Sequence, residues 1–544
     1  MRLFAALLLV GCSSSTTVAP DAGVDAGPPV CGAPDPCIDG PPVENRLRMR
    51  PADVLANQIG DAIARVVRWD EPTLARPLGP FATSPEPTDA MVGTRFDALR
   101  GIATDEAARI ADECGDADCI DGRVATLIGA AFARPLDLDE TSAIGDALGA
   151  RSSAEVESVL LQGFLSPDAW VIREVGAPLS PGDRARRFAA AFWRSGPDGA
   201  LLRAFASGEA PERIVDRLLG DARSRRGFER FHGELLGPTL GEGALVDRMV
   251  EETDAYLESI VSNPDATYAD WIAAPHTFVD DALAEHYGLP DRPGPELSRV
   301  SLDPSRATLL AHGSITSGRS IPLRGAFVLE RLLCRTVPSP PAAEPMPPPP
   351  SDGTTGRERY EALLEPPCVG CHATFDPFGF ALEAYDSEGG FRSVDSGRPI
   401  DDGYPETCIG TTLLPEGSGA GALGSWLAAE PDAHACFARQ WTRYLTQADP
   451  GECQVDELGF DPESGRLRDL HAALVLADAT RSVARDPIGS HPFVASAGDL
   501  GLSAIDATIA RIDEWHSAET SDADRALLGR LRDQWALLRM RLTR

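Results

Sequence analysis

The stretch Cys368-Val369-Gly370-Cys371-His372 decides how the rest of the chain is interpreted. Two thiols separated by two residues and followed directly by a histidine form the pattern of covalent c-type haem attachment. The sulfurs form thioethers with the haem vinyl groups, and the adjacent imidazole binds the iron from the proximal side. With 11 cysteines and 9 histidines in 544 residues, about 0.004 such matches are expected by chance. We therefore predict haem c as a covalent cofactor, attached at Cys368 and Cys371 with His372 as the proximal iron ligand.

Three other interpretations of this stretch stay open. Cys368 and Cys371 fit half of a zinc site, although a structural zinc usually has a second ligand pair at short spacing. The later cysteines Cys408, Cys436 and Cys453 are far apart in the sequence. A thioredoxin-like redox pair belongs in a strand–helix–strand context, which the flanking sequence does not show. A simple disulfide between the two thiols is the third alternative.

The N-terminus has the pattern of an exported lipoprotein. An apolar run over residues 3–10 is too short to span a bilayer, and Leu9-Val10-Gly11-Cys12 resembles a bacterial lipobox. We predict a signal peptide over residues 1–11, lipidation of Cys12 and a flexible tether over residues 12–44. An ordinary secretory signal with cleavage elsewhere is the alternative.

Export fits the haem prediction, because both c-type haem attachment and stable disulfides belong outside the cytoplasm. Ser13 follows the lipidation site, where aspartate would suggest retention at the inner membrane. We therefore expect a protein of the cell envelope that is anchored to a membrane by its lipid. The outer membrane is favoured, with the chain facing either the periplasm or the cell surface.

Composition limits the partners. The net charge of −33 argues against nucleic acid, which recruits basic surfaces. After the signal peptide no apolar run approaches membrane-spanning length, and 544 residues correspond to about two to four domains. Besides the lipid anchor, the expected partner is a redox protein of unidentified kind.

Hydrophobic periodicity predicts a mainly α fold. Apolar residues from Val246 to Val261 recur on one helical stripe, and Asp137 to Glu140 has the acidic character of a helix start. We predict a multi-domain helical body with a small cytochrome c-like haem module inserted before a C-terminal helical segment. The expected parts after the tether are an N-terminal helical region (45–150), a helical domain (151–298), a connector with a proline-rich run (299–350), the haem module (351–455) and a C-terminal helical region (456–544).

The cysteines outside the motif suggest disulfides. Cys114 and Cys119 bracket a four-residue loop that a local bridge would close. Cys436 and Cys453 flank a helix and are expected to pair, which leaves Cys334 and Cys408 to pair with each other.

The distal iron ligand has no single candidate. His312, Met346 and His434 are the available side chains, with His312 preferred, and an open or water-bound position is the alternative. Phe375, three residues after His372, is expected to pack against the haem edge.

Several segments resemble planctomycete and myxobacterial cytochrome-like proteins built from consecutive domains of unknown function. The segments that carry the resemblance are FARPL (132–136), FLSPDAWVIRE (164–174), FAAAFWRSGPDGALL (188–202), MVEETDAYLESIV (249–261), DWIAAPHTFVDDALAEHYGLP (270–290), LLAHGSI (309–315), IPLRGAFVLERLLC (321–334) and CVGCHATFDPFGFALEAYDSEGGFR (368–392). The resemblance implies a mostly helical body that carries a c-type haem module.

The function predicted from these features is electron transfer by an exported, lipid-anchored haem protein. An oxidoreductase with a substrate site in the helical body is one alternative, and a structural or binding surface lipoprotein is another. The sequence contains no Walker-type phosphate-binding loop, nucleophile elbow or His-Glu-x-x-His helix that would indicate other catalysis.

Overall fold

A computed structural model of the chain describes residues 48–69, 87–172, 179–237, 239, 241–337, 353–366, 368–446, 465–478, 502–518 and 522–542. The predicted signal peptide, Cys12, the tether, the proline-rich run with Met346, and Cys453 lie outside these residues. The fold is mainly α, as predicted, and its only strands among the described residues form two-stranded sheets. No helix in the described part of the chain is long and apolar enough to cross a membrane.

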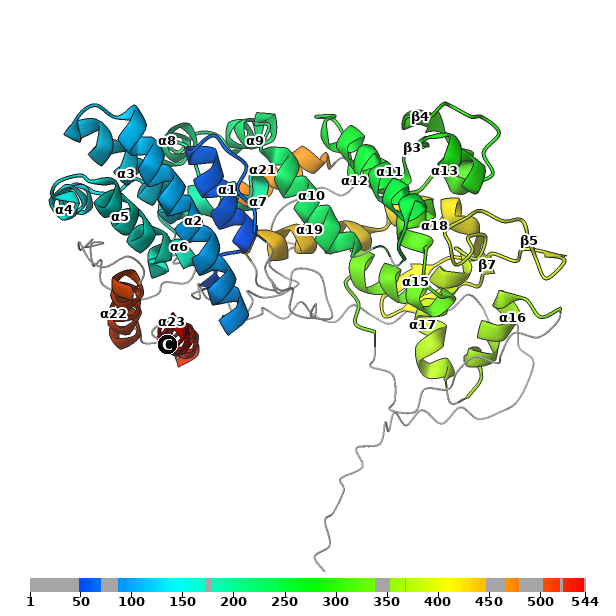
Figure 1. Cartoon of the computed structure of the whole chain (residues 1–544). Coiled ribbons are helices and arrows are strands. Elements are labelled where there is room, and N and C mark those ends of the chain that lie inside the picture. The colour runs from blue at the N-terminus through cyan, green and yellow to red at the C-terminus, as the bar shows by residue number, and fades with distance from the viewer. Residues whose placement is uncertain are drawn as a thin grey trace, which may run out of the picture.

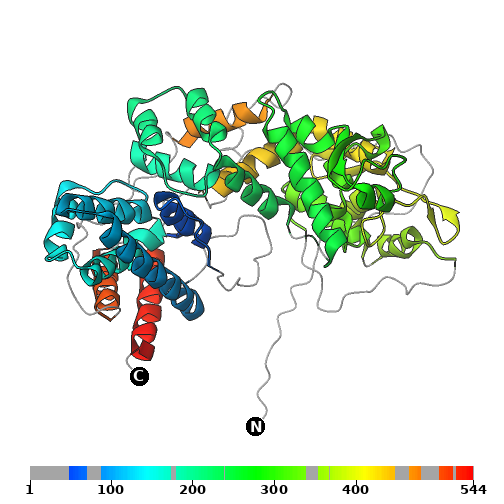
Figure 2. The ribbon, with the colours of Figure 1, turned by 45° about the horizontal axis from the view of Figure 1, so that its top comes forward.

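The helices form an elongated body with a lobe at each end (Figures 1 and 2). The first lobe contains α1 (Ala52–Ala62), α2 (Asp89–Glu113), α3 (Ala117–Phe132), α4 (Leu138–Leu148), α5 (Ser153–Leu165) and α6 (Pro167–Trp170). The C-terminal helices α22 (Leu502–Ala518) and α23 (Asp522–Leu542) pack against this lobe, where the rings of Trp170 and Trp535 are 4.9 Å apart. The helices of the first lobe and the C-terminal helices α22 and α23 therefore share one hydrophobic core.

The middle of the body consists of α7 (Pro181–Phe192), α8 (Gly199–Ser207), α9 (Pro211–Gly220), α10 (Ser224–Leu236), α19 (Pro431–Thr446) and α21 (Leu467–Asp478). The second lobe contains α11 (Ala244–Val261), α12 (Tyr268–Ala273), α13 (Asp281–His286), α14 (Gly313–Thr316), α15 (Ile321–Phe327), the π-helix η3 (Val328–Leu332), α16 (Gly356–Glu361), α17 (Val369–Phe380) and α18 (Gly419–Ala429). Short 3₁₀ turns lie at η1 (Pro304–Arg306), η2 (Leu309–Ala311) and η4 (Ala362–Leu364).

The described part of the chain contains five antiparallel strand pairs beside the helices. They are β1 (Arg48–Met49) with β2 (Val171–Ile172), β3 (His276–Val279) with β4 (Ser298–Ser301), β5 (Val394–Asp395) with β6 (Arg398–Pro399), β7 (Gly403–Tyr404) with β10 (Gly417–Ser418), and β8 (Thr407–Ile409) with β9 (Thr412–Leu414). In the longest pair His276 faces Ser301 and Val279 faces Ser298. The last three pairs lie in the segment between α17 and α18.

The hydrophobic cores group the chain differently from the ranges expected from the sequence. One core joins residues 49–171 to residues 505–538, and a second runs from residue 185 to residue 475. The expected C-terminal region is thus divided, because α21 packs on α9 while α22 and α23 pack on the first lobe. Phe378 and Leu382 of the expected haem module lie in the same core as Phe188, so this segment shares its core with the helical body.

Two local predictions hold, the second with the exception of Val250, which is exposed. Helix α4 begins at a capping box in which Asp137 and Glu140 accept each other's backbone N–H. Helix α11 buries Met249, Thr253 and Leu257 along the expected stripe.

Helix α17, which carries the haem motif, is fixed against α15 at very short range. A Cβ atom at Gly325 would overlap the carbonyl oxygen of Phe375, and one at Gly379 would overlap that of Ile321. Next to Gly325, the buried guanidinium of Arg324 donates to the carbonyl oxygens of Leu382 at 2.8 Å and Tyr385 at 2.7 Å, just beyond the end of α17. These contacts hold α17 in one position.

The disulfides are partly those expected from the sequence. Cys114 and Cys119 are bonded to each other. Cys436 is bonded to Cys334, so the expected Cys436–Cys453 and Cys334–Cys408 pairs are wrong. The reason is tertiary: α19 brings Cys436 beside the end of η3, with Cα atoms 5.3 Å apart, although 102 residues separate the two cysteines.

Candidate haem-attachment site

The motif lies at the beginning of α17. Cys368 is the N-cap residue, and the backbone N–H of His372 donates to its carbonyl oxygen at 3.2 Å. Helical geometry therefore places Cys368 and His372 one turn apart on the same face. Cys371 is exposed, Cys368 is half-buried and the His372 side chain keeps 20 % of its exposure. All three reactive groups can be reached from outside.

The two cysteines of the motif are the free thiols of the described chain. Of the seven cysteines described, Cys114, Cys119, Cys334, Cys408 and Cys436 are in disulfides. Cys368 and Cys371 are not. The pair is therefore available for thioether formation, and a disulfide between its own thiols is not present.

A buried carboxylate holds the imidazole of the motif. The Nδ1 atom of His372 lies 2.9 Å from Oδ2 of Asp376, one helical turn further along α17. Burial raises the pKa of Asp376 to about 6, and the charge and hydrogen bond of His372 oppose this rise. With Nδ1 donating to the carboxylate, Nε2 carries the lone pair that an iron ion requires. Phe375 packs on the same imidazole, with ring centroids 4.9 Å apart.

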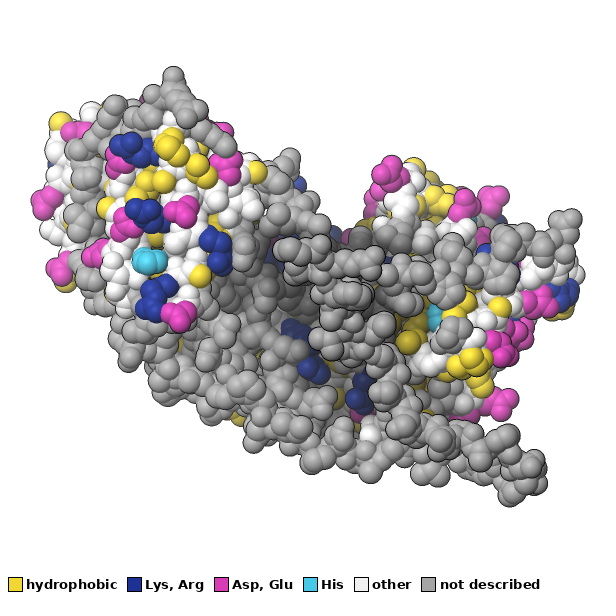
Figure 3. All heavy atoms as spheres, turned by 90° about the horizontal axis from the view of Figure 1, so that it is seen from below, with side chains coloured by type: hydrophobic (Ala, Val, Ile, Leu, Met, Phe, Trp, Pro, Cys, Tyr) yellow, Lys and Arg dark blue, Asp and Glu magenta, His cyan; other side chains and the backbone are white. Residues whose placement is uncertain are grey.

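A groove of about 730 Å³ runs along α17 from the motif. Val369, inside the motif, and Ala373, directly after His372, lie on its wall together with Pro377 and Phe380. Four carboxylates and one guanidinium also line the groove, from Glu361, Asp401, Glu406, Glu416 and Arg357. On the underside of this lobe, hydrophobic and acidic side chains lie next to one another (Figure 3). The groove beside the motif is therefore lined by both apolar and acidic side chains.

The donor set fits a c-type haem. Two reachable thiols, an imidazole oriented through Nδ1 and an adjoining apolar wall are the features that such a group requires. The other interpretations find less support in the described residues. No cluster of three or more His, Cys, Asp or Glu side chains able to hold a metal occurs in this part of the chain. The residues before the motif form α16 and η4 rather than a strand.

His312 lies in a separate buried network. Its Nδ1 atom is 3.0 Å from the Thr253 hydroxyl and its Nε2 atom 3.4 Å from that of Thr277. Burial lowers the pKa of His312 to about 3. None of its contacts is shared with His372, and both ring nitrogens have hydroxyl partners. The geometry does not bring this candidate distal ligand to the motif.

His434 is no better placed. Its Nε2 atom lies 2.8 Å from the carbonyl oxygen of Ala428, and its ring packs on Tyr268 at 4.5 Å. The side chain belongs to the core between α12 and α19. Met346 lies outside the described residues.

Two acidic residues of interest were missed from the sequence. Asp376 lies four residues after His372, and this spacing puts the two side chains on one helical face. The spacing alone could therefore have identified Asp376 as a partner of His372. Glu252 is 1 % exposed and accepts from the hydroxyls of Thr277 and Tyr287, while burial raises its pKa to about 7. Its partners come from distant segments, and no sequence pattern indicates them.

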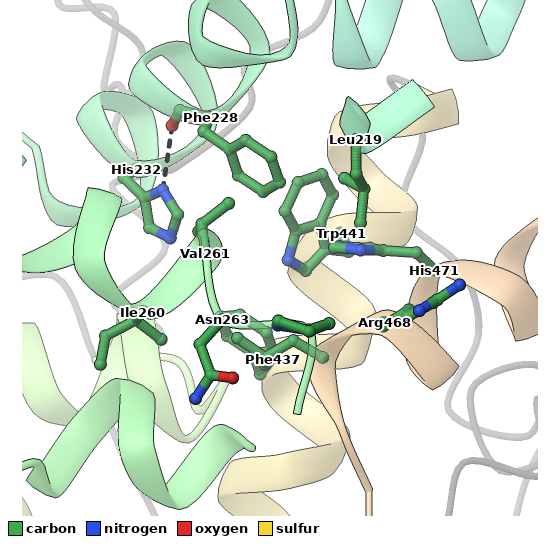
Figure 4. Close-up of a pocket in the computed structure, with 12 residues that line it drawn as sticks. Leu219, Phe228, His232, Ile260, Val261, Asn263, Phe437, Trp441, Arg468 and His471 are labelled. Carbon is green, nitrogen blue, oxygen red and sulfur yellow. Dashed lines mark hydrogen bonds between the residues drawn. The ribbon is translucent and has the colours of Figure 1, made fainter. Parts of the chain in front are cut away.

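A second, small pocket lies in the middle of the body (Figure 4). It has a volume of about 30 Å³, and Trp441 and His471 lie side by side on its wall. His232 donates from Nδ1 to the Phe228 carbonyl and accepts from the Trp271 indole through Nε2. Both ring nitrogens of His471 lack a partner among the described residues. The pocket has room for water but not for a substrate.

Family models match two parts of the chain. Residues 305–395 match PSCyt3, a protein family of unknown function (DUF1588), and this range includes Cys368, Cys371 and His372. Residues 179–289 match PSD4, another protein family of unknown function (DUF1592). The two names suggest cytochrome-like families of planctomycetes, in line with the resemblance seen in the sequence. No curated protein and no solved structure matches the chain.

Proposed function

We propose that this chain is an exported, lipid-anchored c-type haem protein that transfers electrons. The observation that carries the proposal is the selective state of the cysteines. Among the seven described, only Cys368 and Cys371 are free, and they stand directly before a histidine whose Nδ1 is already engaged.

Each residue of the site has a defined role in this proposal. Cys368 and Cys371 hold the cofactor covalently, and His372 binds the iron through Nε2. When bound, haem c supplies one-electron chemistry. The close packing of α17 on α15 through Gly325 and Gly379 keeps the ligand in place, which favours rapid electron transfer because little has to move.

The setting in the cell is also part of the proposal. The disulfides at Cys114–Cys119 and Cys334–Cys436 fit an oxidising compartment, which is where haem c is attached. Lipidated Cys12 would anchor the chain to a membrane of the cell envelope, with the outer membrane favoured. The carboxylates beside the motif suit a redox partner with a basic surface.

The test is a pyridine haemochrome spectrum combined with the intact mass. The protein is exported from a host that has haem-attachment machinery. We expect a c-type spectrum and a mass increase of one haem, both lost in Cys368→Ala/Cys371→Ala. Cys114→Ala/Cys119→Ala is the matched control, because it removes two distant cysteines and should keep the haem. A colourless wild-type protein would exclude the proposal and leave a structural or binding lipoprotein.

The spin state then separates electron transfer from enzyme activity. A low-spin, six-coordinate spectrum supports electron transfer, because both axial positions are filled. A high-spin spectrum that shifts on addition of cyanide or imidazole supports an oxidoreductase with an open iron position.

A further inference from the structure

The carboxylate behind His372 is unlike the other buried carboxylates of this chain. Among the described residues, seven acidic side chains are buried. Five of them form an ion pair with arginine: Glu106, Glu140, Asp183, Asp280 and Glu383. Glu252 is held by hydroxyl groups, and Asp376 is held by an imidazole. Asp376 is thus the one buried carboxylate of the described chain that faces a prospective metal ligand.

Asp376 has little other stabilisation. The residue has no exposed surface, and among the described residues its only side-chain hydrogen bond is the one from His372 Nδ1 at 2.9 Å. Its second oxygen, Oδ1, is buried without a partner among the described residues. A buried carboxylate is costly unless a positive charge or several donors face it. Here the missing positive charge would be supplied through the imidazole by an iron ion.

This arrangement distinguishes between the two oxidation states of the iron. Ferric iron carries one more positive charge than ferrous iron, so the carboxylate interacts more favourably with the ferric state. A hydrogen bond from Nδ1–H to a carboxylate also makes Nε2 a stronger donor to the metal. Both effects act in the same direction.

We infer that Asp376 is a positioning residue that orients His372 and lowers the reduction potential of the attached haem. The inference rests on the proposed haem attachment and deepens it. The haem would then accept electrons only from a strongly reducing partner and would pass them on readily. A low reduction potential would place this protein at the start of a series of electron carriers.

The test compares Asp376→Asn with the wild-type holoprotein in a spectroelectrochemical titration. The asparagine oxygen can still accept from Nδ1–H, so the variant removes the charge and keeps the geometry. We expect unchanged haem per chain and at least a tenfold higher ferrous-to-ferric ratio at a fixed potential, which corresponds to a rise of about 59 mV for one electron. Asp401→Asn is the matched control, because this carboxylate is 69 % exposed on the same groove and does not contact His372.

The outcomes are distinct for the two proposals. A wild-type protein without haem overturns both the function and the inference. A haem-loaded Asp376→Asn protein whose ratio stays within twofold of wild type overturns the inference alone. A second measurement does not need the Asn variant to fold: ¹⁵N shifts of haem-free Cys368→Ala/Cys371→Ala protein at pH 8 should place the His372 proton on Nδ1. A proton on Nε2 would overturn the inference as well.

Discussion

Cys334 and Cys436 are joined by a disulfide with Cα atoms 5.3 Å apart, and the covalent loop of 102 residues that they close contains the whole of α17. The bond ties the end of η3 to α19 in the middle of the body. The disulfide therefore joins the two ends of the segment that contains the haem motif, and it should raise the free energy of unfolding.

Removing this disulfide should lower stability substantially. We expect Cys334→Ala/Cys436→Ala to lose about 2–4 kcal/mol, because the unfolded chain regains the freedom of a long loop. Urea unfolding followed by circular dichroism measures the change. Peptide mapping of the non-reduced protein checks the pairing, and a Cys436–Cys453 peptide would contradict the structure.

The crossing of α15 and α17 should not tolerate a methyl group. Gly379→Ala places a Cβ against the Ile321 carbonyl oxygen, and overpacking of this kind costs about 1–3 kcal/mol. Gly101→Ala in α2 is the control, since no atom lies within 4 Å of its Cβ position. This control should gain up to about 1 kcal/mol from helix propensity. Equal thermal midpoints for the two variants would argue against the close crossing.

The buried Glu252 should make stability fall as the pH rises from about 4.5 to about 7. Its pKa is about 7 in the folded chain and near 4.5 when exposed, so the folded state binds the proton more tightly. Stability is therefore unaffected below about pH 4.5 and is lost progressively up to about pH 7, by about 3 kcal/mol in total.

The difference between wild type and Glu252→Gln isolates this effect. The variant should be relatively more stable at pH 8 than at pH 5, as measured by urea midpoints at both values. Glu251→Gln, which removes an exposed neighbour on α11, serves as the control and should show no such dependence. A pH-independent difference for Glu252→Gln would contradict the prediction.

Substitution by phenylalanine should change stability differently at two buried histidines of the small central pocket. His232→Phe removes the acceptor of the Trp271 indole N–H and should cost about 1–3 kcal/mol. His471→Phe removes two ring nitrogens that have no partner among the described residues, and it should be neutral or stabilising. Thermal unfolding of the pair provides the comparison. A loss at His471 as large as that at His232 would show that a bound water serves its nitrogens.

The sequence predicted what repeats along a helix and missed what joins distant segments. The stripe of α11 and the capped start of α4 follow from periodicity and from local hydrogen bonding, which act over a few residues. The bond between Cys334 and Cys436 depends on how η3 meets α19, and spacing along the chain carries no information about that.

The candidate site shows the same division. Cys368, Cys371 and His372 are adjacent in the sequence, so their pattern was visible at once. Asp376 lies one turn away and could have been found from helical spacing. The hydroxyl partners of His312 come from α11 and β3, and only the folded chain shows that they occupy its ring.

The mixture of bonded and free cysteines sets an order for the maturation of the chain. During the proposed export the chain emerges from its N-terminus, so Cys334 meets Cys368 and Cys371 before Cys436 has appeared. Pairing in order of emergence would consume a thiol of the motif and leave Cys436 without its native partner Cys334. The native pattern therefore requires capture of the motif's thiols before oxidation, or later exchange of a wrong bond. We expect the yield of mature protein to fall in a host that lacks a disulfide isomerase, because a wrong bond to a thiol of the motif would then persist.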